Sequence, residues 1–518
     1  MQKLDFLLCS LPRMTMTYPP SAPALLKSIL LANGFTARTR DFVCEWFYKF
    51  KDHPEYNAID SWTAMGALQV EKDIEKEIDD TVTQWAQELC DTGAEWIGLS
   101  IFSYESHKLG KVFAQKIKEI NPEQKIFMGG SGITTISEKY PQKLYDAGMI
   151  DAFITGEGEQ SIIEFAKGNF DYPGINDMNY KQITPEIIDR TPEPNFDDYN
   201  LDLYGKENLL IYKQFDSATW ADFNKDIHVL PITASRGCVR KCVYCDVPSQ
   251  WPKFTHRGGE SIANEIINHY KKSGTRKFHF TDSLVNGSMK EFRVMIDNLA
   301  KYNTDTGANI TWTGQFIFRR KGQHTKEDWQ TMARSGASVL ELGLESLCDD
   351  IRFEMGKKIT NEDILYEFEL ARQNKISTWC NLIVGWPTET EEKFEQGKQF
   401  LVDLHPFAHD KTILNLELGV TVRITQNTPL KDNMEQMGLE FIPTPGEQED
   451  LLWWCKYNPE LTFSKRILRR IEFGNFAKDL GFTNPKNGYD MEYLWSKWNQ
   501  FKDIELAWHN ERKNRITT

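Results

Sequence analysis

The sequence is poor in cysteine, and its few cysteines are unevenly spread. The chain has 518 residues and nine cysteines, and three of the nine fall within eight residues. An odd number with one tight group argues against a disulfide framework and fits a reducing compartment. We expect the isolated ones to behave as small hydrophobic residues in cores. They are Cys9, Cys44, Cys90, Cys348, Cys380 and Cys455.

Long apolar runs and an excess of basic charge are also absent. No run reaches transmembrane length, and the N-terminus lacks the small-residue cleavage site of a signal peptide. The net charge of −14 makes non-specific binding to nucleic acid or anionic membrane unfavourable. We interpret the basic group at Lys465-Arg466 and Arg469-Arg470 as a solvated helix face. These features predict a cytoplasmic protein.

The N-terminal part, residues 1–170, alternates apolar runs with helical patterns, which predicts βαβ units and a doubly wound parallel sheet. The expected strands are Leu4–Leu11, Phe35–Val43, Trp96–Phe102, Lys125–Met128 and Ala152–Ile154. The expected helices are Pro23–Ala32, Val70–Cys90, His107–Ile120, Ile136–Ala147 and Glu159–Ala166. Residues 171–227, rich in Pro, Asp, Asn and Tyr, are interpreted as a connector.

The alternation resumes over residues 228–440, where six βα pairs predict a partial barrel of the (βα)6 type. The expected strands are His228–Ala234, Lys277–Phe280, Ile310–Phe316, Ser338–Leu344, Ser377–Val384 and Ile413–Val422. The expected helices are Glu260–Lys271, Met289–Tyr302, Lys326–Ala333, Asn361–Gln373 and Glu391–Leu404. Residues 441–518 are expected to form a small helical cap, with helices in Phe463–Phe473 and Met491–His509. Aromatic residues in the cap either touch substrate or belong to its core.

The three clustered cysteines predict a metal site. Cys238, Cys242 and Cys245 have the spacing C-x3-C-x2-C. Thiolates are the protein ligands of iron–sulfur clusters, and a closed [4Fe–4S] cluster takes four. Three ligands without an obvious fourth leave one iron open, as in a catalytic site. A zinc site would need a second pair of ligands, whereas His256 and His279 are isolated.

This motif, with an aromatic residue (Tyr244) before the last cysteine, resembles the signature of the radical S-adenosylmethionine (SAM) superfamily. The resemblance implies that the cysteines hold a [4Fe–4S] cluster whose open iron binds SAM. The cluster then reduces SAM to methionine and a 5′-deoxyadenosyl radical. An electron donor such as flavodoxin or ferredoxin is implied as well.

The resemblance also implies SAM contacts at the strand ends, where barrel active sites assemble. Asp282 and Ser283 follow the second strand, where the family holds the amino-acid end of SAM; a plain turn fits these residues equally well. Glu345 resembles the carboxylate that binds the ribose, although it can also cap a helix. The segment with Gly385 and Pro387 resembles the region near the adenine, and Thr388 with Glu391 is a possible capping box.

The triplet Gly258-Gly259-Glu260 spells a SAM-binding motif of the same family but precedes the second strand. We therefore interpret it as a helix start with Glu260 in the first turn.

The predicted N-terminal sheet resembles the cobalamin-binding domain of one radical SAM subgroup. Ligands of such sheets bind at the carboxyl ends of the strands, and small residues gather there: Ser100, Gly129, Gly130 and Gly156. Glycines at such turns are also common without a ligand. The familiar D-x-H-x-x-G motif is missing after the first strand, and we interpret His107 as a helix-start residue rather than a cobalt ligand.

The resemblance favours a cobalamin-dependent radical SAM enzyme that methylates an unactivated carbon of a small molecule or peptide. A radical rearrangement, cyclisation or oxidation is the alternative. A methylthiotransferase would need cluster ligands among Cys9, Cys44 and Cys90. A non-enzymatic iron–sulfur protein is the fourth hypothesis. We expect a monomer or a small homo-oligomer, and the substrate cannot be inferred from the sequence.

Overall fold

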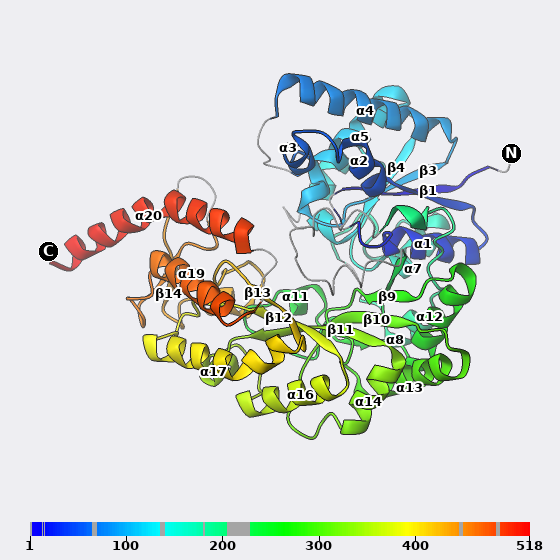
Figure 1. Ribbon diagram of the computed structural model, residues 1–518. Coiled ribbons are helices and arrows are strands. Elements are labelled where there is room, and N and C mark those ends of the chain that lie inside the picture. Colours follow the sequence, from blue (N-terminus) through cyan, green and yellow to red (C-terminus); the bar gives the residue numbers. More distant parts are fainter. Residues whose placement is uncertain are drawn as a thin grey trace. The chain divides into compact units, whose positions relative to one another are not determined.

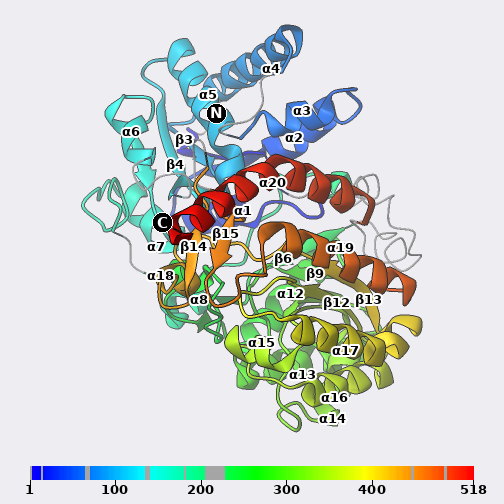
Figure 2. The ribbon, with the colours of Figure 1, turned by 90° about the vertical axis from the view of Figure 1, so that its left-hand side faces the viewer.

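The computed structural model describes residues 3–12, 14, 16–64, 70–134, 140–179, 182–204, 228–444, 449–482 and 487–517. The chain forms two compact units, Met1–Pro231 and Ile232–Thr518, shown in Figures 1 and 2. The domain limits expected at residues 170, 227 and 440 remain predictions. Residues 205–227 of the expected connector, and residues 136–139 of one expected helix, lie outside the described residues.

The first unit contains a five-stranded parallel sheet of order β2-β1-β3-β4-β5, so the predicted doubly wound sheet is confirmed. Its strands are β1 (Phe6–Ser10), β2 (Ala37–Asp41), β3 (Trp96–Ser100), β4 (Lys125–Gly129) and β5 (Ala152–Ile154). Its helices are α1 (Ser21–Ala32), α2 (Phe42–Phe50), α3 (Tyr56–Ser61), α4 (Lys72–Asp91), α5 (His107–Ile120), α6 (Tyr140–Asp146), α7 (Gly158–Ala166) and α8 (Pro185–Arg190). The strand order reverses between β1 and β3, where such sheets bind ligands.

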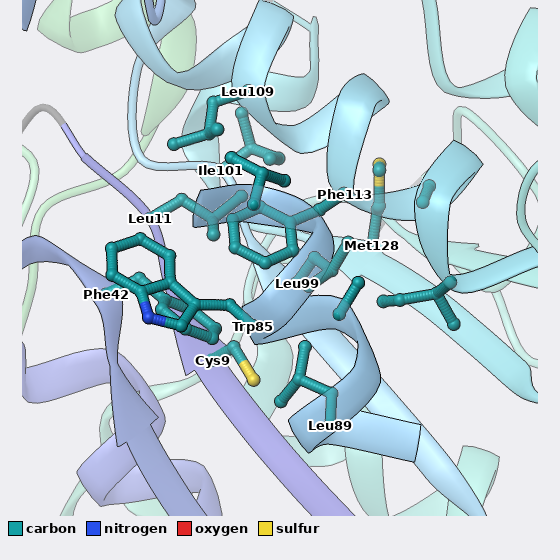
Figure 3. Packing of buried hydrophobic residues seen from close by; sticks show 14 of the residues in the cluster. Cys9, Leu11, Phe42, Trp85, Leu89, Leu99, Ile101, Leu109, Phe113 and Met128 are labelled. Atoms are coloured by element: carbon teal, nitrogen blue, oxygen red, sulfur yellow. The ribbon is translucent and has the colours of Figure 1, made fainter. Parts of the chain in front are cut away.

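Both faces of this sheet are covered, because alternate residues of a strand point to opposite faces. Leu7 and Cys9 of β1 join a hydrophobic cluster with residues of α2, α4 and α5. Figure 3 shows part of this cluster, with Trp85, Phe113 and their neighbours packed together. The neighbouring residues of β1, Phe6 and Leu8, face a second cluster with α1 and α7.

The strand expected at residues 35–43 was too long at its C-terminal end. The expected strand 35–43 runs into α2, because the Asp41 side chain accepts a hydrogen bond from the Val43 N–H and caps a helix there. The aromatic residues after Asp41 therefore form a buried helix face rather than a strand, and the sequence analysis missed this helix.

The second unit contains a six-stranded sheet of order β13-β12-β11-β10-β9-β6, so the predicted partial barrel is confirmed. Its strands are β6 (Val229–Ile232), β9 (Lys277–Phe280), β10 (Thr311–Phe316), β11 (Ala337–Glu345), β12 (Ser377–Leu382) and β13 (Ile413–Leu418). The principal helices around it are α12 (Gly259–Ser273), α13 (Met289–Thr306), α14 (Lys326–Ser335), α16 (Asn361–Gln373) and α17 (Glu391–His409). These helices lie along one side of the sheet in Figure 1. The unit boundary falls within β6.

Shorter elements complete the second unit. They are β7 (Ser235–Arg236), α11 (Val247–Gln250), β8 (Thr255–His256), α15 (Asp349–Glu354), α18 (Pro429–Asp432), β14 (Leu439–Phe441), β15 (Trp453–Cys455), α19 (Phe463–Asp479) and α20 (Asn487–Thr517). The region expected to form a small helical cap thus also contains β15, which pairs antiparallel with β14 at the start of that region. Within the described segments, none of the helices combines the length and apolar character that a membrane span requires.

Candidate functional site

The three clustered cysteines lie on the loop between β7 and β8, which pair as a short antiparallel ribbon. Cys242 is buried, whereas Cys238 and Cys245 are half-buried. Two main-chain hydrogen bonds hold the middle of the loop. The Val243 N–H donates to the Met355 carbonyl (3.2 Å), and the Val243 carbonyl accepts from the Leu430 N–H (2.7 Å). The loop is therefore fixed to two distant segments of the same unit.

The three thiols supply the type of donor atom that iron–sulfur clusters bind in proteins. Within the described segments, no three His, Cys, Asp or Glu side chains come close enough to hold a single metal ion. A [4Fe–4S] cluster takes one thiolate at each iron, so its ligands stand apart. The Arg240 N–H donates to the Cys238 sulfur (3.4 Å), and such bonds to sulfur tune cluster potentials. The residues present therefore fit a [4Fe–4S] cluster.

Burial governs the protonation of the free thiols. It raises the pKa of Cys245 to about 11 and raises the pKa of Cys242, which Lys357 partly offsets. A thiolate loses solvation when buried, and a coordinated metal deprotonates the thiol outright. Binding of the cluster therefore releases protons from this loop.

Glu345, at the end of β11, lies beside the cysteine loop. Burial and Glu345 raise the pKa of Tyr244, whose hydroxyl is hydrogen-bonded to that carboxylate. Glu345 also forms an ion pair with the Lys357 ammonium (3.2 Å), which donates a hydrogen bond to the Gly343 carbonyl (2.7 Å). The structure thus brings Cys242, Tyr244 and Glu345 together. The sequence analysis missed Lys357, for which the sequence contains no signal.

The backbone at Glu345 is strained. Its φ angle is 65°, and the pairing of β11 with β12 shifts register between Gly343 and Glu345. A left-handed conformation at a residue other than glycine costs energy and is concentrated at functional sites. The bulge turns the Glu345 carboxylate toward Lys357 and Tyr244, where a ribose ligand is expected.

Asp282 is buried beneath the strand that leads to the cysteines. Its carboxylate accepts hydrogen bonds from the main-chain N–H groups of Ala234 (3.0 Å) and Ser235. Burial raises the pKa of Asp282 to about 7, against the lowering effect of these bonds. The carboxylate therefore holds the start of the cysteine loop, and its contact with SAM remains a prediction. Ser283 follows it and is half-buried.

Gly385 and Pro387 follow β12 and are buried. The φ angle of Gly385 is +89°, and a Cβ there would lie 2.6 Å from Thr421 Oγ1, so only glycine fits. The Pro387 carbonyl accepts a hydrogen bond from the Asn458 side chain (3.1 Å). The capping box expected from Thr388 is wrong, because the cap of α17 is Thr390, which accepts from the Lys393 N–H.

The helix start expected at Gly258-Gly259-Glu260 is confirmed, since α12 begins at Gly259 with Glu260 in its first turn.

Three residues of the basic group on α19, Arg466, Arg469 and Arg470, are buried, so the interpretation as a solvated face is wrong for them, whereas Lys465 is half-exposed. Arg466 donates to the carbonyls of Trp453 (3.0 Å) and Leu451 (2.7 Å). Arg470 donates to the Gly419 carbonyl (2.7 Å) just beyond β13. Arg469 forms a buried ion pair with Glu389 (3.1 Å). Arg469 and Arg470 thus attach α19 to the segments after β12 and β13, and Arg466 attaches it to the segment that contains β15.

The tryptophans of the C-terminal region pack mainly in cores. Trp453 is buried in one hydrophobic cluster together with Tyr244. Trp454, Trp498 and Trp508 belong to another. Trp495 is partly exposed and contacts Trp498. A contact of these residues with substrate remains a prediction.

A small cavity lies between Arg240 of the cysteine loop and the ends of β10 and β11. Its lining includes Arg240, Phe316, Phe318, Gly343 and Lys357. It opens at the carboxyl ends of parallel strands, where barrel active sites lie.

In the first unit, the small residues predicted to bind cobalamin lie at the carboxyl edge of the sheet. Ser100 ends β3 and Gly129 ends β4, and Gly156 follows β5. Gly130 has a φ angle of +105° and packs against the main chain of Ile101, which leaves no room for a Cβ. Two large exposed aromatic side chains, Phe102 and Tyr104, follow β3 at the same edge. Small and aromatic residues together fit a broad, flat ligand.

His107 is the first residue of α5, which confirms its interpretation as a helix-start residue. It is buried, its Nε2 hydrogen-bonds the Gly132 carbonyl, and its ring stacks on Tyr140 at 4.3 Å. Burial lowers its pKa. The Nε2 atom of His107 is therefore engaged by the main chain.

Comparisons with known proteins indicate the class of domain that the second unit contains. The model of the radical SAM superfamily matches residues 232–401, a segment that begins at the unit boundary and contains all three cysteines. The second unit therefore carries a radical SAM domain.

The chain is also similar in sequence to several curated proteins. The chain is 25% identical over 306 residues to an uncharacterized methyltransferase, PH0819, of Pyrococcus horikoshii, covering 57% of this chain and 61% of that protein. It is 27% identical over 181 residues to the bacteriochlorophyllide d C-12(1)-methyltransferase of Chlorobaculum tepidum, covering 34% and 37%. It is 25% identical over 299 residues to the anaerobic magnesium-protoporphyrin IX monomethyl ester cyclase of Rubrivivax gelatinosus, covering 56% and 51%. The matches thus span less than two thirds of each relative.

Solved structures share the fold of both units. The cobalamin-dependent SAM radical enzyme OxsB, solved with aqua-cobalamin and SAM, has a TM-score of 0.60 and 14% identity, covering 97% of this chain and 72% of that one. The radical SAM methyltransferase TsrM of Kitasatospora setae, with cobalamin and a [4Fe–4S] cluster, has a TM-score of 0.57 and 14% identity, covering 90% and 82%. The chain therefore shares the fold of these two solved structures.

Proposed function

We propose that this protein is a cobalamin-dependent radical SAM enzyme that methylates an unactivated carbon. The observation that carries the proposal is the fixed loop with Cys238, Cys242 and Cys245 at the mouth of a partial barrel. When bound, the cluster and SAM supply a 5′-deoxyadenosyl radical, and cobalamin supplies a methyl carrier.

In this proposal, different residues of the chain hold the cluster, bind SAM and fix the loops around the site. The three thiolates hold the cluster, and Tyr244 and Lys357 orient the Glu345 carboxylate from two sides. Glu345 accepts hydrogen bonds from a ribose. Asp282 fixes the strand end that leads into the cysteine loop. The buried arginines of α19 hold the loops after β12 and β13, which helps to keep water from the barrel mouth.

The N-terminal sheet supports the choice of cobalamin. The edge with Ser100, Gly129, Gly130 and Gly156 presents small residues beside exposed aromatic rings. Cys9, Cys44 and Cys90 give no support to methylthio transfer. Cys9 and Cys44 are buried in different hydrophobic clusters, and burial raises the pKa of Cys44 to about 12.

The test is anaerobic reconstitution with iron, sulfide and cobalamin, followed by reduction in the presence of SAM. The proposal predicts a bound cobalamin spectrum and formation of 5′-deoxyadenosine and S-adenosylhomocysteine. Production of 5′-deoxyadenosine without retained cobalamin or S-adenosylhomocysteine would instead support a rearrangement, cyclisation or oxidation. Loss of bound cobalamin on Gly130→Leu, with the cluster intact, would place the cobalamin at the predicted edge.

The proposal also includes the location of the protein, its oligomeric state, its substrate class and its electron donor. We propose a cytoplasmic enzyme, monomeric or a small homo-oligomer, that acts on a small molecule or peptide and receives electrons from a flavodoxin or ferredoxin.

A further inference from the structure

The inner face of the barrel carries a row of polar side chains below Glu345. In the paired registers, Gln315 of β10 lies opposite Glu341 of β11, and Glu341 lies opposite Trp379 of β12. Trp379 in turn lies opposite Asn415 of β13. Residues opposite one another on neighbouring strands share a face, so these four form one row across the sheet.

This row faces away from the helices. The residue after Gln315, Phe316, points to the opposite face, where its ring contacts Trp329 of α14 (6.0 Å between centroids). Because successive side chains alternate between faces, Gln315 and Glu341 point into the barrel. Glu417 of β13 lies on this inner face as well, since its carboxylate accepts a hydrogen bond from Trp379 Nε1 (3.1 Å).

Two of these side chains, those of Asn415 and Glu341, have no hydrogen-bond or ion-pair partner in the segments that the structure describes. Asn415 is 3% exposed, and neither its side-chain nitrogen nor its oxygen has a hydrogen-bond partner among the described residues. A buried amide normally has its hydrogen bonds satisfied. Glu341 is also without a hydrogen bond or ion pair in the described part of the chain, and it interacts repulsively with Glu417.

The Lys357 ammonium at the barrel mouth is already paired elsewhere. Lys357 bonds Glu345 and the Gly343 carbonyl. Glu341 lies four residues before Glu345 on β11, which is roughly 13 Å along the strand. The inner face thus presents two carboxylates, an indole and an unpaired amide, well below the residues that are expected to hold SAM.

We propose that this inner face, formed by Glu341, Glu417, Trp379 and Asn415, binds a cationic N–H group of the substrate, an amine or a guanidinium. Carboxylates accept charge-assisted hydrogen bonds from such a cation, and an indole attracts it through its π face. Asn415 supplies an acceptor and a donor for a neighbouring polar group. The inference rests on the proposed function, because it assigns the substrate class of that same barrel.

The first experiment compares two probes of the same shape, butylguanidinium and its neutral isostere butylurea, by ligand-observed NMR on the full chain. The expected result is saturable binding of the cation only, weakened at least roughly tenfold in Glu341→Gln and in Glu417→Gln. The matched control is Glu327→Gln, which removes the same charge from the exposed start of α14. Equal binding of both probes, or unchanged binding in Glu341→Gln, overturns the inference.

A second measurement separates a binding role from a structural one. Glu341→Gln removes the repulsion from Glu417, so we expect the thermal midpoint of the free protein to rise, since binding sites are often kept at a cost in stability. A fall in the midpoint would show that Glu341 supports the fold and would overturn the inference.

The same preparations are then reconstituted and assayed for cleavage of SAM. If SAM is cleaved but the cation does not bind, this inference fails and the proposed function stands. If the cation binds through Glu341 but SAM is not cleaved, the proposed function fails.

Discussion

The buried carboxyl group of Asp282 predicts how the stability of the metal-free protein changes with pH. Asp282 is 4% exposed, and burial raises its pKa from 3.8 to about 7. In the unfolded chain the carboxyl group loses its proton near the lower value. Between these two pH values the folded state therefore binds more protons than the unfolded state, so stability falls as the pH rises.

The size of this effect follows from the two pKa values. A difference of roughly three pH units corresponds to at most about 4 kcal/mol of unfolding free energy. We expect this amount to be lost progressively between pH 4 and pH 7. Asp282→Asn keeps an oxygen that accepts from the N–H groups of Ala234 and Ser235 but cannot ionise. The variant should therefore lack this part of the pH dependence.

The assay is denaturant unfolding of wild type and Asp282→Asn at about pH 5 and pH 8. The expected result is a variant that gains stability relative to wild type at the higher pH. Asp297→Asn, on the exposed side of α13, is the matched control and should show no such change. The reasoning is refuted if the free-energy difference between wild type and Asp282→Asn is the same at both pH values.

Three further substitutions test the packing around the site. Gly385→Ala should lower the unfolding free energy by at least about 1–2 kcal/mol, because Gly385 has a positive φ angle and an added Cβ would collide with Thr421. An unchanged denaturation midpoint would contradict this prediction. Arg466→Met leaves two buried carbonyls unpaired and should lower the unfolding free energy by about 1–3 kcal/mol for each. The control, Lys465→Met, should leave the unfolding free energy nearly unchanged. Equal melting temperatures of the two variants would count against the buried role of Arg466. His107→Ala should lower the melting temperature but leave the absorption maximum of bound cobalamin unchanged, since its Nε2 is bonded to a main-chain carbonyl; a shifted maximum would indicate a cobalt ligand.

The fold was predictable because its signals are local. The strand at Lys277–Phe280 and the helix at Asn361–Gln373 have the bounds expected from their apolar patterns. One exception is α2, where an aromatic-rich stretch after Asp41 suits a strand or a helix by composition. There the capping hydrogen bond from Val43 to Asp41 decides the structure.

The candidate site was predictable only in part. The cysteine spacing and the strand ends carry the motif, so the sequence predicted Cys242, Tyr244 and Glu345 as site residues, and the structure brings these three together. Lys357 and Arg466 were not, because their partners are distant in the sequence or are main-chain carbonyls. Solvated and buried arginines have the same sequence pattern, and only tertiary contacts distinguish them.

The most direct test of the central claim is the iron content and SAM cleavage of the anaerobically reconstituted protein. We compare wild type with a variant in which Cys238, Cys242 and Cys245 are all replaced by alanine, and use Cys90→Ala as the control. Wild type and control should bind about four iron atoms per chain and release 5′-deoxyadenosine from SAM under reduction, whereas the triple variant should do neither. Retention of iron and of SAM cleavage by the triple variant would contradict the claim.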